Sequence, residues 1–443
     1  HGAFHDHYAQ YSFGTLTEVY RKLAACGLPG EYPVEINRRL RRAGTAWAWA
    51  TLGDSVAPNL RQRVYLAWTK DPRVTGPSGR TDFAIGAAKV AAASGGPDPL
   101  GDRELAGLVL AVNPASAPPE WKSAWDAKGF TAIPLAGNLS LPTAGAQIHR
   151  RPGWMVVVRG QNKFFRGGEG TGGGYRYSQW GMRSTYGQRF CTGSLFIADS
   201  GTPLDPTESG WTATGFNPAR IPGTTGEVLP EDKMVGSLFG TGATQGGGCD
   251  LDGQGLWALE LGGVKKSVFF IDDRITSVTS GVGPAKSPGA VATTISQAAE
   301  FTPLALELDG KAVAESTATN LPAGQAHAIL DGRKRGYFIH PGGDGLRLHR
   351  GEQSWIYCEM PFFNPAADPN INAGTNSFRT VVWDKSAGPF TTAQVNAGNK
   401  AQIEGPRKLT YFTPSTQRFT TIGFDHGPAT TPAQAHAFTL LMS

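Results

Sequence analysis

The chain has 443 residues, of which 17% are charged, and its 41 basic and 36 acidic side chains give a formal net charge of +5. This mild excess is spread along the chain without a basic stripe interleaved with aromatic residues, so we expect no nucleic-acid partner. No apolar run approaches the roughly 20 residues needed to cross a bilayer, so we expect no membrane partner either. The 59 glycines and 31 prolines follow no collagen-like period and indicate a β protein with many turns.

The first part of the chain, up to about Phe130, has a helical pattern. In residues 11–27 apolar side chains recur on one face, and the stretch ends at Gly27, a residue type suited to a helix C-terminus. Short helices joined by Pro/Gly loops, as at the end of a helical array, are also predicted. They cover residues 59–70, 82–96 and 102–114.

The remainder of the chain predicts strands. The segments are short, rich in β-branched and aromatic residues, and bounded by Gly, Pro, Asn or Asp. They are residues 153–160, 265–282, 303–313, 326–332, 335–340, 346–351, 378–384, 408–414 and 418–427. This succession predicts an all-β sandwich larger than one immunoglobulin-type unit, and the lack of a fixed-period repeat argues against a propeller.

Four cysteines, at positions 26, 191, 249 and 358, form no CxxC or CxxxC pair. A zinc knot or a redox dithiol is therefore not expected, and isolated buried thiols are the favoured interpretation.

The stretch HGAFHDHYAQYSF (1–13) concentrates titratable rings. His5 and His7 are two residues apart and would face one way on a strand, with His1 nearby. A metal site would need a third ligand, for which the sequence offers no position. Exposed histidines at a helix entrance and an acid–base pair of His7 with Tyr11 are the other interpretations, since His titrates near neutrality and Tyr can donate a proton.

Two further stretches carry candidate side chains. Glu169 lies in a glycine-dense loop that is followed by Tyr175, Arg176 and Trp180, residue types suited to stacking on sugar rings and pairing with acid groups. The GEGTGGG run lacks the Lys-Ser/Thr ending of a phosphate-binding loop, and a flexible surface hairpin is the alternative. Arg80 lies in a Pro/Gly turn that opens the helix expected near Thr81, where its guanidinium could meet an anion.

Taken together, these stretches resemble the polysaccharide lyases of family 8, and most of all their chondroitin ABC lyase branch. A segment of the form DG…H…YSF carries the catalytic His and Tyr there, and it matches His7 and Tyr11, with His1 in place of the Asp. The turn PSGRTDF resembles the turn with the catalytic Arg, at Arg80, and NKFFRGGEG places Glu169 at the catalytic Glu. Further likenesses follow in the family's order: AQIHRRPGWMVVV (146–158), GYRYSQWG (174–181), GWTATGFNPARIPGTT (210–225), VKKSVFFIDDRI (264–275) and TIGFDHGPATTPAQAHAFTLL (421–441).

The resemblance implies an α+β chain: the C-terminal part of an α/α toroid over residues 1–132, followed by a large antiparallel β-sandwich domain over residues 133–443. Family members carry a further Asn upstream, together with most of the toroid, and neither is in this chain. The missing N-terminal toroid portion of the same protein is therefore an expected partner. Secretion or a periplasmic location is expected.

The resemblance also implies a reaction, the β-elimination of an acidic polysaccharide next to a uronic acid. Tyr11 and His7 would act as acid and base, and Arg80 and Glu169 would support them, so no cofactor or metal is expected. The expected substrate-binding residues are His5, Asn162, Tyr175, Arg176 and Trp180. Three alternatives stay open: a non-catalytic carbohydrate-binding β-sandwich fragment, a metal-dependent hydrolase using the three N-terminal histidines, and a lyase for another uronan such as xanthan or an algal polysaccharide.

Overall fold

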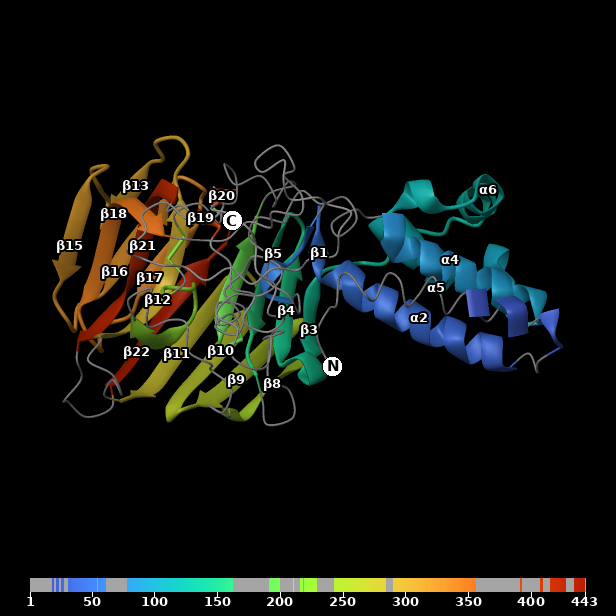
Figure 1. The fold of residues 1–443 in the computed structure, drawn as a ribbon, viewed down its shortest axis with the longest axis horizontal. Helices are drawn as coiled ribbons and strands as arrows, with labels where there is room; N and C mark the ends of the chain where they lie inside the picture. The colour runs from blue at the N-terminus through green and yellow to red at the C-terminus, as the bar shows by residue number, and fades with distance from the viewer. Residues whose placement is uncertain are drawn as a thin grey trace.

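A computed structural model of the chain describes most of its helices and sheets. The described residues are 18–19, 21–23, 25–27, 31–53, 55–60, 78–161, 191–199, 210, 216–217, 219–228, 243–283, 290–355, 391–392, 407–408, 415–427 and 434–442. Helices gather at one end of the molecule and antiparallel sheets at the other (Figure 1). The last helix ends at Ala127 and the first long strand begins at Gly137. The domain division predicted at residue 132 falls between them and stays a prediction.

Among the described residues, four α-helices with complete bounds lie at the helical end, and they share one buried core. Small side chains of α4, such as Ala84 and Ala88, lie beside Leu40 of α2 and Leu105 of α5, so the helices can approach closely. Trp125 of α6 closes the same core and donates to the carbonyl oxygen of Pro99 at 2.9 Å. The bounds are α2 (Glu31–Trp49), α4 (Ser78–Ala93), α5 (Arg103–Val112) and α6 (Pro119–Ala127), with 3-10 turns η1 (Pro58–Leu60), η3 (Pro99–Gly101), η4 (Pro114–Ser116) and η5 (Pro142–Ala144).

A buried ion pair fixes α2 against α5. Asp102 is the N-cap of α5 and accepts a hydrogen bond from the backbone N–H of Leu105 at 3.0 Å. The same carboxylate accepts from Arg41 of α2, Nη1 to Oδ2 at 2.7 Å, and both side chains are less than a tenth exposed. The carboxylate of Asp102 is therefore paired with a positive charge and also hydrogen-bonded to the backbone, as a buried charge needs to be.

A four-stranded antiparallel sheet comes next in the chain. Its strands run in sequence order, β3 (Gly137–Leu141), β4 (Ala146–Arg151), β5 (Trp154–Arg159) and β6 (Ser194–Ala198). β5 is buried along its whole length, as expected for an uninterrupted apolar run. A two-stranded pair, β1 (Thr51–Leu52) with β2 (Ser55–Val56), precedes it directly after α2.

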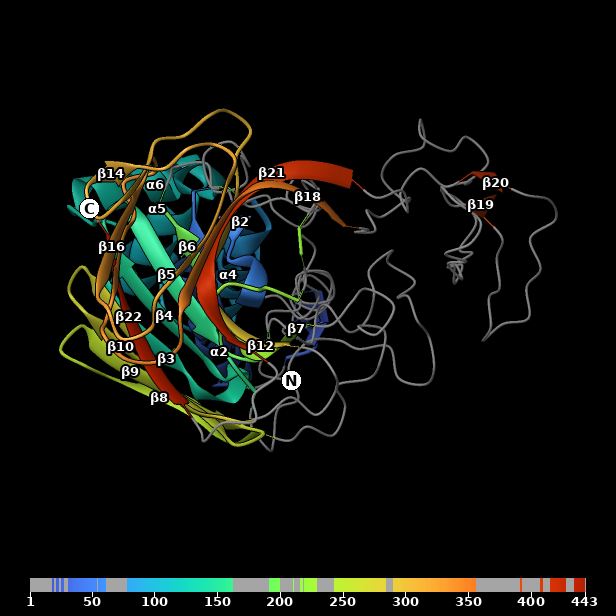
Figure 2. The same ribbon diagram turned by 90° about the vertical axis from the view of Figure 1, so that its left-hand side faces the viewer.

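Two larger antiparallel sheets follow, and Figure 2 shows them from the end opposite the helices. The nine-stranded sheet has the order β14 (Lys311–Ala312), β13 (Leu306–Leu308), β16 (His327–Asp331), β17 (Gly336–Ile339), β22 (Gln434–Leu441), β11 (Arg274–Val282), β10 (Val264–Ile271), β9 (Gln254–Leu261) and β8 (Ala243–Leu251). The five-stranded sheet has the order β15 (Thr317–Leu321), β18 (Leu346–Trp355), β21 (Ser415–Gly427), β12 (Ala290–Ala299) and β7 (Thr225–Val228). A further pair joins β19 (Thr391–Thr392) to β20 (Arg407–Lys408).

One hydrophobic cluster joins the four-, five- and nine-stranded sheets. Val158 of β5, Phe270 of β10, Leu348 of β18 and Phe424 of β21 belong to it, and each is at most 1% exposed. The strands therefore turn one face toward a common core, in keeping with the alternating burial along β10 and β11. These residues bring the four-stranded sheet and both larger sheets into one packed unit.

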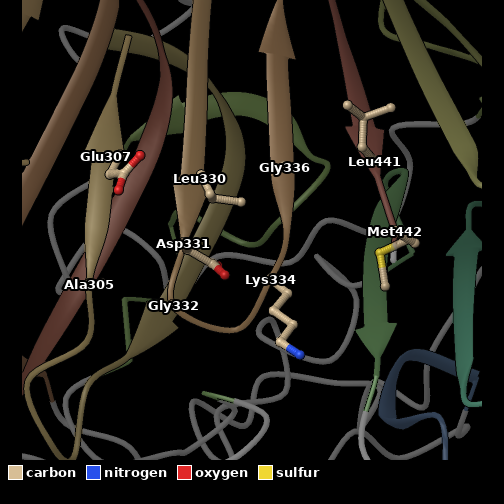
Figure 3. Close-up of a pocket in the computed structure, with 9 residues that line it drawn as sticks. All are labelled: Ala305, Glu307, Leu330, Asp331, Gly332, Lys334, Gly336, Leu441 and Met442. Atoms are coloured by element: carbon tan, nitrogen blue, oxygen red, sulfur yellow. The ribbon is translucent and has the colours of Figure 1, made fainter. Parts of the chain in front are cut away.

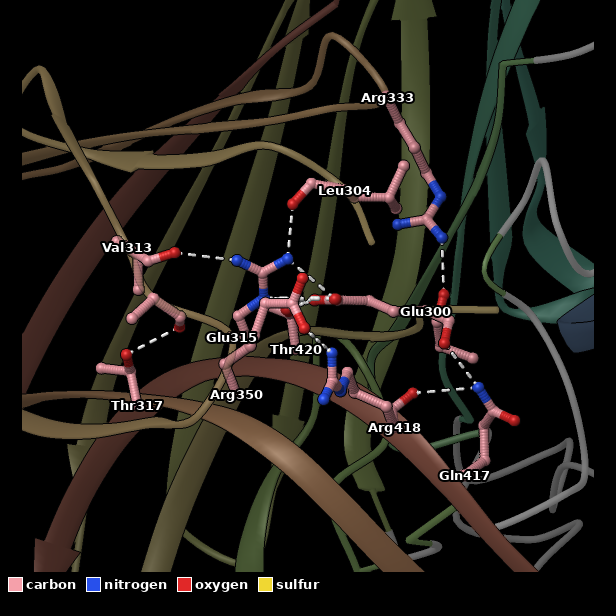
Figure 4. A network of polar contacts seen from close by, with 12 residues as sticks. Glu300, Leu304, Val313, Glu315, Thr317, Arg333, Arg350, Gln417, Arg418 and Thr420 are labelled. Carbon is pink, nitrogen blue, oxygen red and sulfur yellow. Dashed lines mark hydrogen bonds and ion pairs between the residues drawn. The ribbon is translucent and has the colours of Figure 1, made fainter. Parts of the chain in front are cut away.

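A buried ion pair holds the five-stranded sheet to the loops beside it (Figure 4). Arg350 of β18 donates from Nε and Nη2 to the two carboxylate oxygens of Glu300, each at 2.9 Å, and both side chains are 2% exposed. The guanidinium also donates to the carbonyl oxygens of Val313 and Leu304, and Thr420 of β21 donates to Glu300. The charges are therefore paired and surrounded by hydrogen bonds, as buried charges must be.

The structure corrects the expectation for the thiols. Cys191 is buried, but Cys26 and Cys249 are exposed, so burial holds for one of the three cysteines within the described residues. No described helix is long and apolar enough to cross a membrane.

Candidate functional site

Most of the predicted site residues lie outside the described part of the chain. These are His5, His7, Tyr11, Asn162, Glu169, Tyr175, Arg176 and Trp180. Their roles stay predictions. Arg80 lies within a described element, because α4 begins at Ser78 rather than near Thr81. Its backbone therefore belongs to the first turn of α4 and not to the turn before the helix, which corrects the expected placement.

The start of α4 is anchored next to Arg80. Thr81 is fully buried, and its Oγ1 is hydrogen-bonded to Oγ of Ser116 in η4. Ser116 in turn donates to the carbonyl oxygen of Asn113 at 2.8 Å, at the end of α5. The backbone at Arg80 is therefore held to α5 as well as to α2, which favours a fixed position for any group that it carries.

Arg150 of β4 connects the helical end to the four-stranded sheet. Its Nη1 donates to the carbonyl oxygen of Ala48 at 2.9 Å and to that of Thr51, at the end of α2. The last turn of α2 has no basic residue of its own, so Arg150 supplies the positive charge that the C-terminal carbonyls favour. Burial lowers the pKa of Arg150 to about 10, which leaves the guanidinium charged at neutral pH.

A second contact between the two parts is fully buried. Asn59 of η1 donates from Nδ2 to the carbonyl oxygen of Val157 in β5 at 3.1 Å, and to Oγ of Ser194 in β6 at 3.2 Å. In return, Arg159 of β5 donates from Nη1 to the backbone oxygen of Asn59 at 2.6 Å. Asn59 and Arg159 are both 0% exposed. We call this contact of Asn59, Arg159 and Ser194 the Asn59–Arg159 joint.

His149, from the His-Arg stretch of β4, is a structural residue. Its Nε2 donates to the carbonyl oxygen of Asp272 at 2.7 Å, and its Nδ1 accepts from Nδ2 of Asn138 at 3.0 Å. Burial lowers the pKa of His149 to about 4, and the nearby Arg151 adds to the effect. The ring is therefore neutral at physiological pH and serves as a link between β4 and the β10–β11 turn.

Three of the stretches that carry the family resemblance meet in the core. Lys266 (KKS) donates from Nζ to the carbonyl oxygens of Gly193, at 3.0 Å, and of Gly223 (PGTT). Gly223 has a φ of +83°, and a Cβ there would lie 2.5 Å from the backbone nitrogen of Leu195, so this position needs glycine. Burial lowers the pKa of Lys266 to about 7.

The third stretch, DHG, contributes His426 to the same region. Its Nδ1 pairs with Asp344 and its Nε2 is 3.0 Å from Oγ1 of Thr293. The ring of His436 lies 5.0 Å from it, centroid to centroid, and 4.5 Å from the ring of Phe424. His436 is 4% exposed. These contacts explain the residue types of the three stretches by packing and hydrogen bonding inside the sheets.

His436 predicts an acid-sensitive fold. Burial, and then the charges of His426 and Lys266, lower its pKa to about 3, against an ordinary 6.5. The unfolded chain therefore takes up this proton near pH 6.5 and the folded protein only near pH 3. The contribution of His436 to the free energy of unfolding is fully present above pH 6.5. It falls as the pH drops from about 6.5 to about 3, by at most about 5 kcal/mol in total.

We expect His436→Phe to flatten that pH dependence and to leave the stability at pH 7 within about 1 kcal/mol, because an aromatic ring of similar size refills the site. Urea titrations of the wild type and of His436→Phe at pH 7 and pH 4 measure the free energy of unfolding at each pH. An unchanged loss of stability between the two pH values in the variant would assign the acid sensitivity to other groups.

A surface groove lies at the far end of the nine-stranded sheet from the helices (Figures 1 and 3). Its volume is about 540 Å³, and residues of β13, β16, β17 and β22 line it, with Glu307 and Lys334 as its exposed charged groups. Figure 3 shows Leu330, Leu441 and Met442 as the large apolar side chains of its wall, with Asp331 beside Leu330. The groove is therefore separate from the region around Arg80. Within the described ranges, no three potential metal-binding side chains come together.

Comparisons with known proteins identify the sheet portion. Residues 146–357 match the model described as polysaccharide lyase family 8, super-sandwich domain. The chondroitin sulfate ABC exolyase of Bacteroides thetaiotaomicron is 35% identical over 114 residues, which are 25% of this chain and 10% of that protein. The enzyme of the same name from Proteus vulgaris is 25% identical over 324 residues, 66% of this chain and 30% of that protein. The chain thus spans less than a third of either curated relative.

The fold agrees with this match. The structure of a Paenibacillus xanthan lyase superposes with a TM-score of 0.54 at 16% identity, over 89% of this chain and 35% of that one. Such a low identity shows a shared fold alone. The family model and the two relatives together identify the sheet portion: residues 146–357 are a super-sandwich domain of polysaccharide lyase family 8.

Proposed function

We propose that the chain is part of a polysaccharide lyase that cleaves a uronic-acid-containing glycosaminoglycan by β-elimination. The observation that carries the proposal is the match of residues 146–357 to the super-sandwich domain of this lyase family. Two relatives named chondroitin sulfate ABC exolyase favour chondroitin or dermatan sulfate as the substrate. The superposition on a xanthan lyase keeps other uronans as the alternative substrate class, because the fold carries both activities.

The proposed chemistry removes the C5 proton of the uronate, forms a C4–C5 double bond and breaks the C4–O glycosidic bond. A proton next to a carboxylate is weakly acidic, so donors must stabilise the charge that develops on the carboxylate. His7 and Arg80 are proposed for this task, with the Asn of the upstream toroid. Tyr11 returns a proton to the leaving oxygen. Glu169 orients Arg80 or Tyr11.

The identity of the base depends on the uronate. For glucuronate, Tyr11 takes the C5 proton as well; for the iduronate epimer, whose C5 proton points the other way, His7 takes it. His5, Asn162, Tyr175, Arg176 and Trp180 are proposed to bind the polymer around the cleavage point. The helices (residues 1–132) are proposed as the end of an α/α toroid, and residues 133–443 as the β-sandwich domain. The upstream toroid is the proposed partner, and the enzyme acts outside the cytoplasm.

Ultraviolet absorbance of the unsaturated uronate tests the reaction on chondroitin, dermatan sulfate, hyaluronan and xanthan, with excess chelator present. We expect absorbance to rise with a sulfated galactosaminoglycan and to be unaffected by the chelator, because side chains neutralise the carboxylate. Activity that the chelator abolishes would favour the metal-dependent alternative. No rise with any polymer, combined with retention of the protein on an immobilised polysaccharide, would favour the carbohydrate-binding alternative.

A further inference from the structure

Polar side chains gather on the face of the five-stranded sheet that is turned away from the hydrophobic cluster. Figure 2 shows β18 and β21 side by side in this sheet. Leu348 of β18 belongs to the cluster, so its neighbours Arg347 and His349 point to the opposite face. Thr421 of β21 is the register partner of His349, and Asp425 lies four residues further along the same face.

Two guanidinium groups share one carboxylate on this face. Arg347 donates from Nη1 to Oδ2 of Asp425 at 3.0 Å, and Arg220 donates from Nη2 to Oδ1 at 3.1 Å. Asp425 balances only one of the two positive charges. A guanidinium has five N–H donors, so both arginines keep donors beyond the one that each directs at Asp425. The group therefore combines an excess positive charge with donors that can meet an anion.

A buried amide fixes the loop that brings Arg220 to the sheet. Gln297 of β12 donates from Nε2 to the carbonyl oxygen of Arg220 at 2.7 Å and to that of Asn217 at 3.0 Å. Its Oε1 accepts from the backbone N–H of Asn217 at 2.8 Å, and Gln297 is 3% exposed. A guanidinium held in place before binding loses little conformational freedom when a ligand arrives, which favours affinity.

A hydroxyl without a described partner lies beside these charges. Thr421 is the register partner of both His349 and Gln297, and it is 6% exposed. Its Oγ1 is buried and makes no hydrogen bond within the described part of the chain. A buried hydroxyl normally has a partner, because an unpaired one costs stability. An oxygen atom of a bound ligand would satisfy it.

The ring of His349 reports the excess charge. Partial burial, and then the charges of Arg347 and Arg220, lower the pKa of His349 below its ordinary value. The ring is therefore neutral at physiological pH and can donate one hydrogen bond without adding a further positive charge.

Stabilisation of the fold alone does not account for these features. The side chain of Arg347 is 43% exposed, and water screens ion pairs at such positions, so they contribute little stability. The buried pair of Arg350 with Glu300 in the same sheet has its charges balanced one to one. In contrast, the group around Asp425 leaves one positive charge unbalanced and the hydroxyl of Thr421 unpaired.

We propose that this face binds an anionic group of the polysaccharide, either a sulfate ester or a uronate carboxylate. The binding residues, which we call the Arg347 strip, are Arg220, Arg347, His349 and Thr421. Arginine matches the paired oxygens of both anions, and Asp425 holds the two guanidiniums together. From Thr421 to Asp425 the strand spans about 13 Å, which suits a run of sugars. The choice of a polysaccharide as ligand rests on the proposed lyase function.

Calorimetric titration of the natural full-length protein with chondroitin sulfate hexasaccharides tests the strip. All proteins carry Tyr11→Phe to suppress cleavage. We expect Arg347→Gln to raise Kd about 10-fold, because a hydrogen bond to a charged group is lost. Arg418→Gln is the matched control, since it makes the same change in the same sheet, where Arg418 pairs with Glu315 (Figure 4). We expect it to leave Kd within about 2-fold of the parent.

Thr421→Val separates binding from folding. The substitution keeps the shape of the side chain and removes a hydroxyl that has no described partner. We therefore expect Tm to stay unchanged or to rise, while Kd increases about 3- to 10-fold through the lost hydrogen bond to the ligand. A variant with an unchanged Kd would remove Thr421 from the strip.

Two modified hexasaccharides identify the anion. Desulfated chondroitin keeps the carboxylates, and carboxyl-reduced chondroitin sulfate keeps the sulfate esters. If Arg347→Gln weakens binding of the desulfated sugar, the strip binds a carboxylate. If it weakens binding of the carboxyl-reduced sugar, the strip binds a sulfate ester. Either result supports the strip.

The outcomes separate the strip from the lyase function. A full-length protein that releases no unsaturated product but binds hexasaccharides through Arg347 sinks the lyase function and leaves the strip as a carbohydrate-binding site. Product release combined with a Kd that Arg347→Gln leaves unchanged overturns the strip alone. Equal losses of affinity in Arg347→Gln and Arg418→Gln, or no measurable binding by the parent, also overturn it.

Discussion

Tyr11→Phe is expected to lower kcat for β-elimination by at least about 100-fold and to change KM little. The substitution removes one hydroxyl and keeps the ring, so it takes away the proposed proton donor without removing packing volume. General acid–base catalysis by one side chain typically contributes about 100- to 10,000-fold, which sets the range. Initial rates of ultraviolet absorbance at saturating polymer measure the effect.

Tyr8→Phe is the matched control, because it makes the same chemical change three positions away. We expect that variant to keep the wild-type rate. Equal activity of Tyr11→Phe and the wild type would assign the proton donor to another residue, and equal losses in both variants would indicate a structural role for the segment. On a substrate rich in iduronate, His7→Ala should lower kcat as much as Tyr11→Phe does. There His7 is proposed to remove the C5 proton and Tyr11 to protonate the leaving oxygen, so each variant loses one of the two proton transfers.

Glu300→Gln is expected to reduce the free energy of unfolding by roughly 3–5 kcal/mol. The amide has nearly the same shape as the carboxylate, but it leaves the guanidinium of Arg350 buried with no opposite charge (Figure 4). It also brings a donor toward the hydroxyl of Thr420, which donates to this carboxylate. Urea denaturation followed by circular dichroism measures the change.

Two comparisons make this result interpretable. Glu35→Gln removes the partner of Arg38 on the exposed surface of α2, where water screens the pair, and is expected to have a much smaller effect. The double substitution Glu300→Leu with Arg350→Met removes both charges and should cost less than Glu300→Gln alone, because neither charge is then left unpaired. A double variant that is less stable than the single one would show a net stabilising ion pair.

Amphipathic and alternating patterns predicted the elements that bury one apolar face. The helix expected at 82–96 is α4 (Ser78–Ala93), and that expected at 102–114 contains α5. The strand expected at 265–282 is a hairpin of two strands, because Asp272, at a φ of +52°, turns the chain between β10 and β11. The length of the segment 265–282, more than twice that of an ordinary strand, was the feature of the sequence that indicated a hairpin.

The missed elements bury polar or glycine-rich faces. α2 turns Arg41 inward to reach Asp102, so its buried face does not read as apolar in the sequence. β8 needs Gly246 because the chain just after β5 passes close to it: a Cβ there would lie 2.3 Å from the backbone oxygen of Gln161. Glycine lowers strand propensity, and tertiary packing that a single sequence does not reveal overrides this preference.

The candidate site was less accessible to sequence reasoning than the fold. Residue types, local sequence and the family resemblance suggested His7, Tyr11, Arg80 and Glu169. These residues come from separate segments of the chain, and no sequence pattern predicts the distances between their side chains. The KKS, PGTT and DHG stretches resemble the family, but the likeness assigns them no role. In the structure, Lys266, Gly223 and His426 are occupied by core contacts, which a likeness alone could not distinguish from contacts with a substrate.

The guanidinium of Arg150 has a consequence for how the protein unfolds. The C-terminal carbonyls of α2 receive their hydrogen bonds from a strand about a hundred residues later in the chain. If either partner moves alone, the partly buried guanidinium and the carbonyls lose these hydrogen bonds, which costs stability. The helical and sheet portions are thereby thermodynamically coupled, so that melting of the last turn of α2 and detachment of β4 belong to one cooperative transition and not to two independent ones.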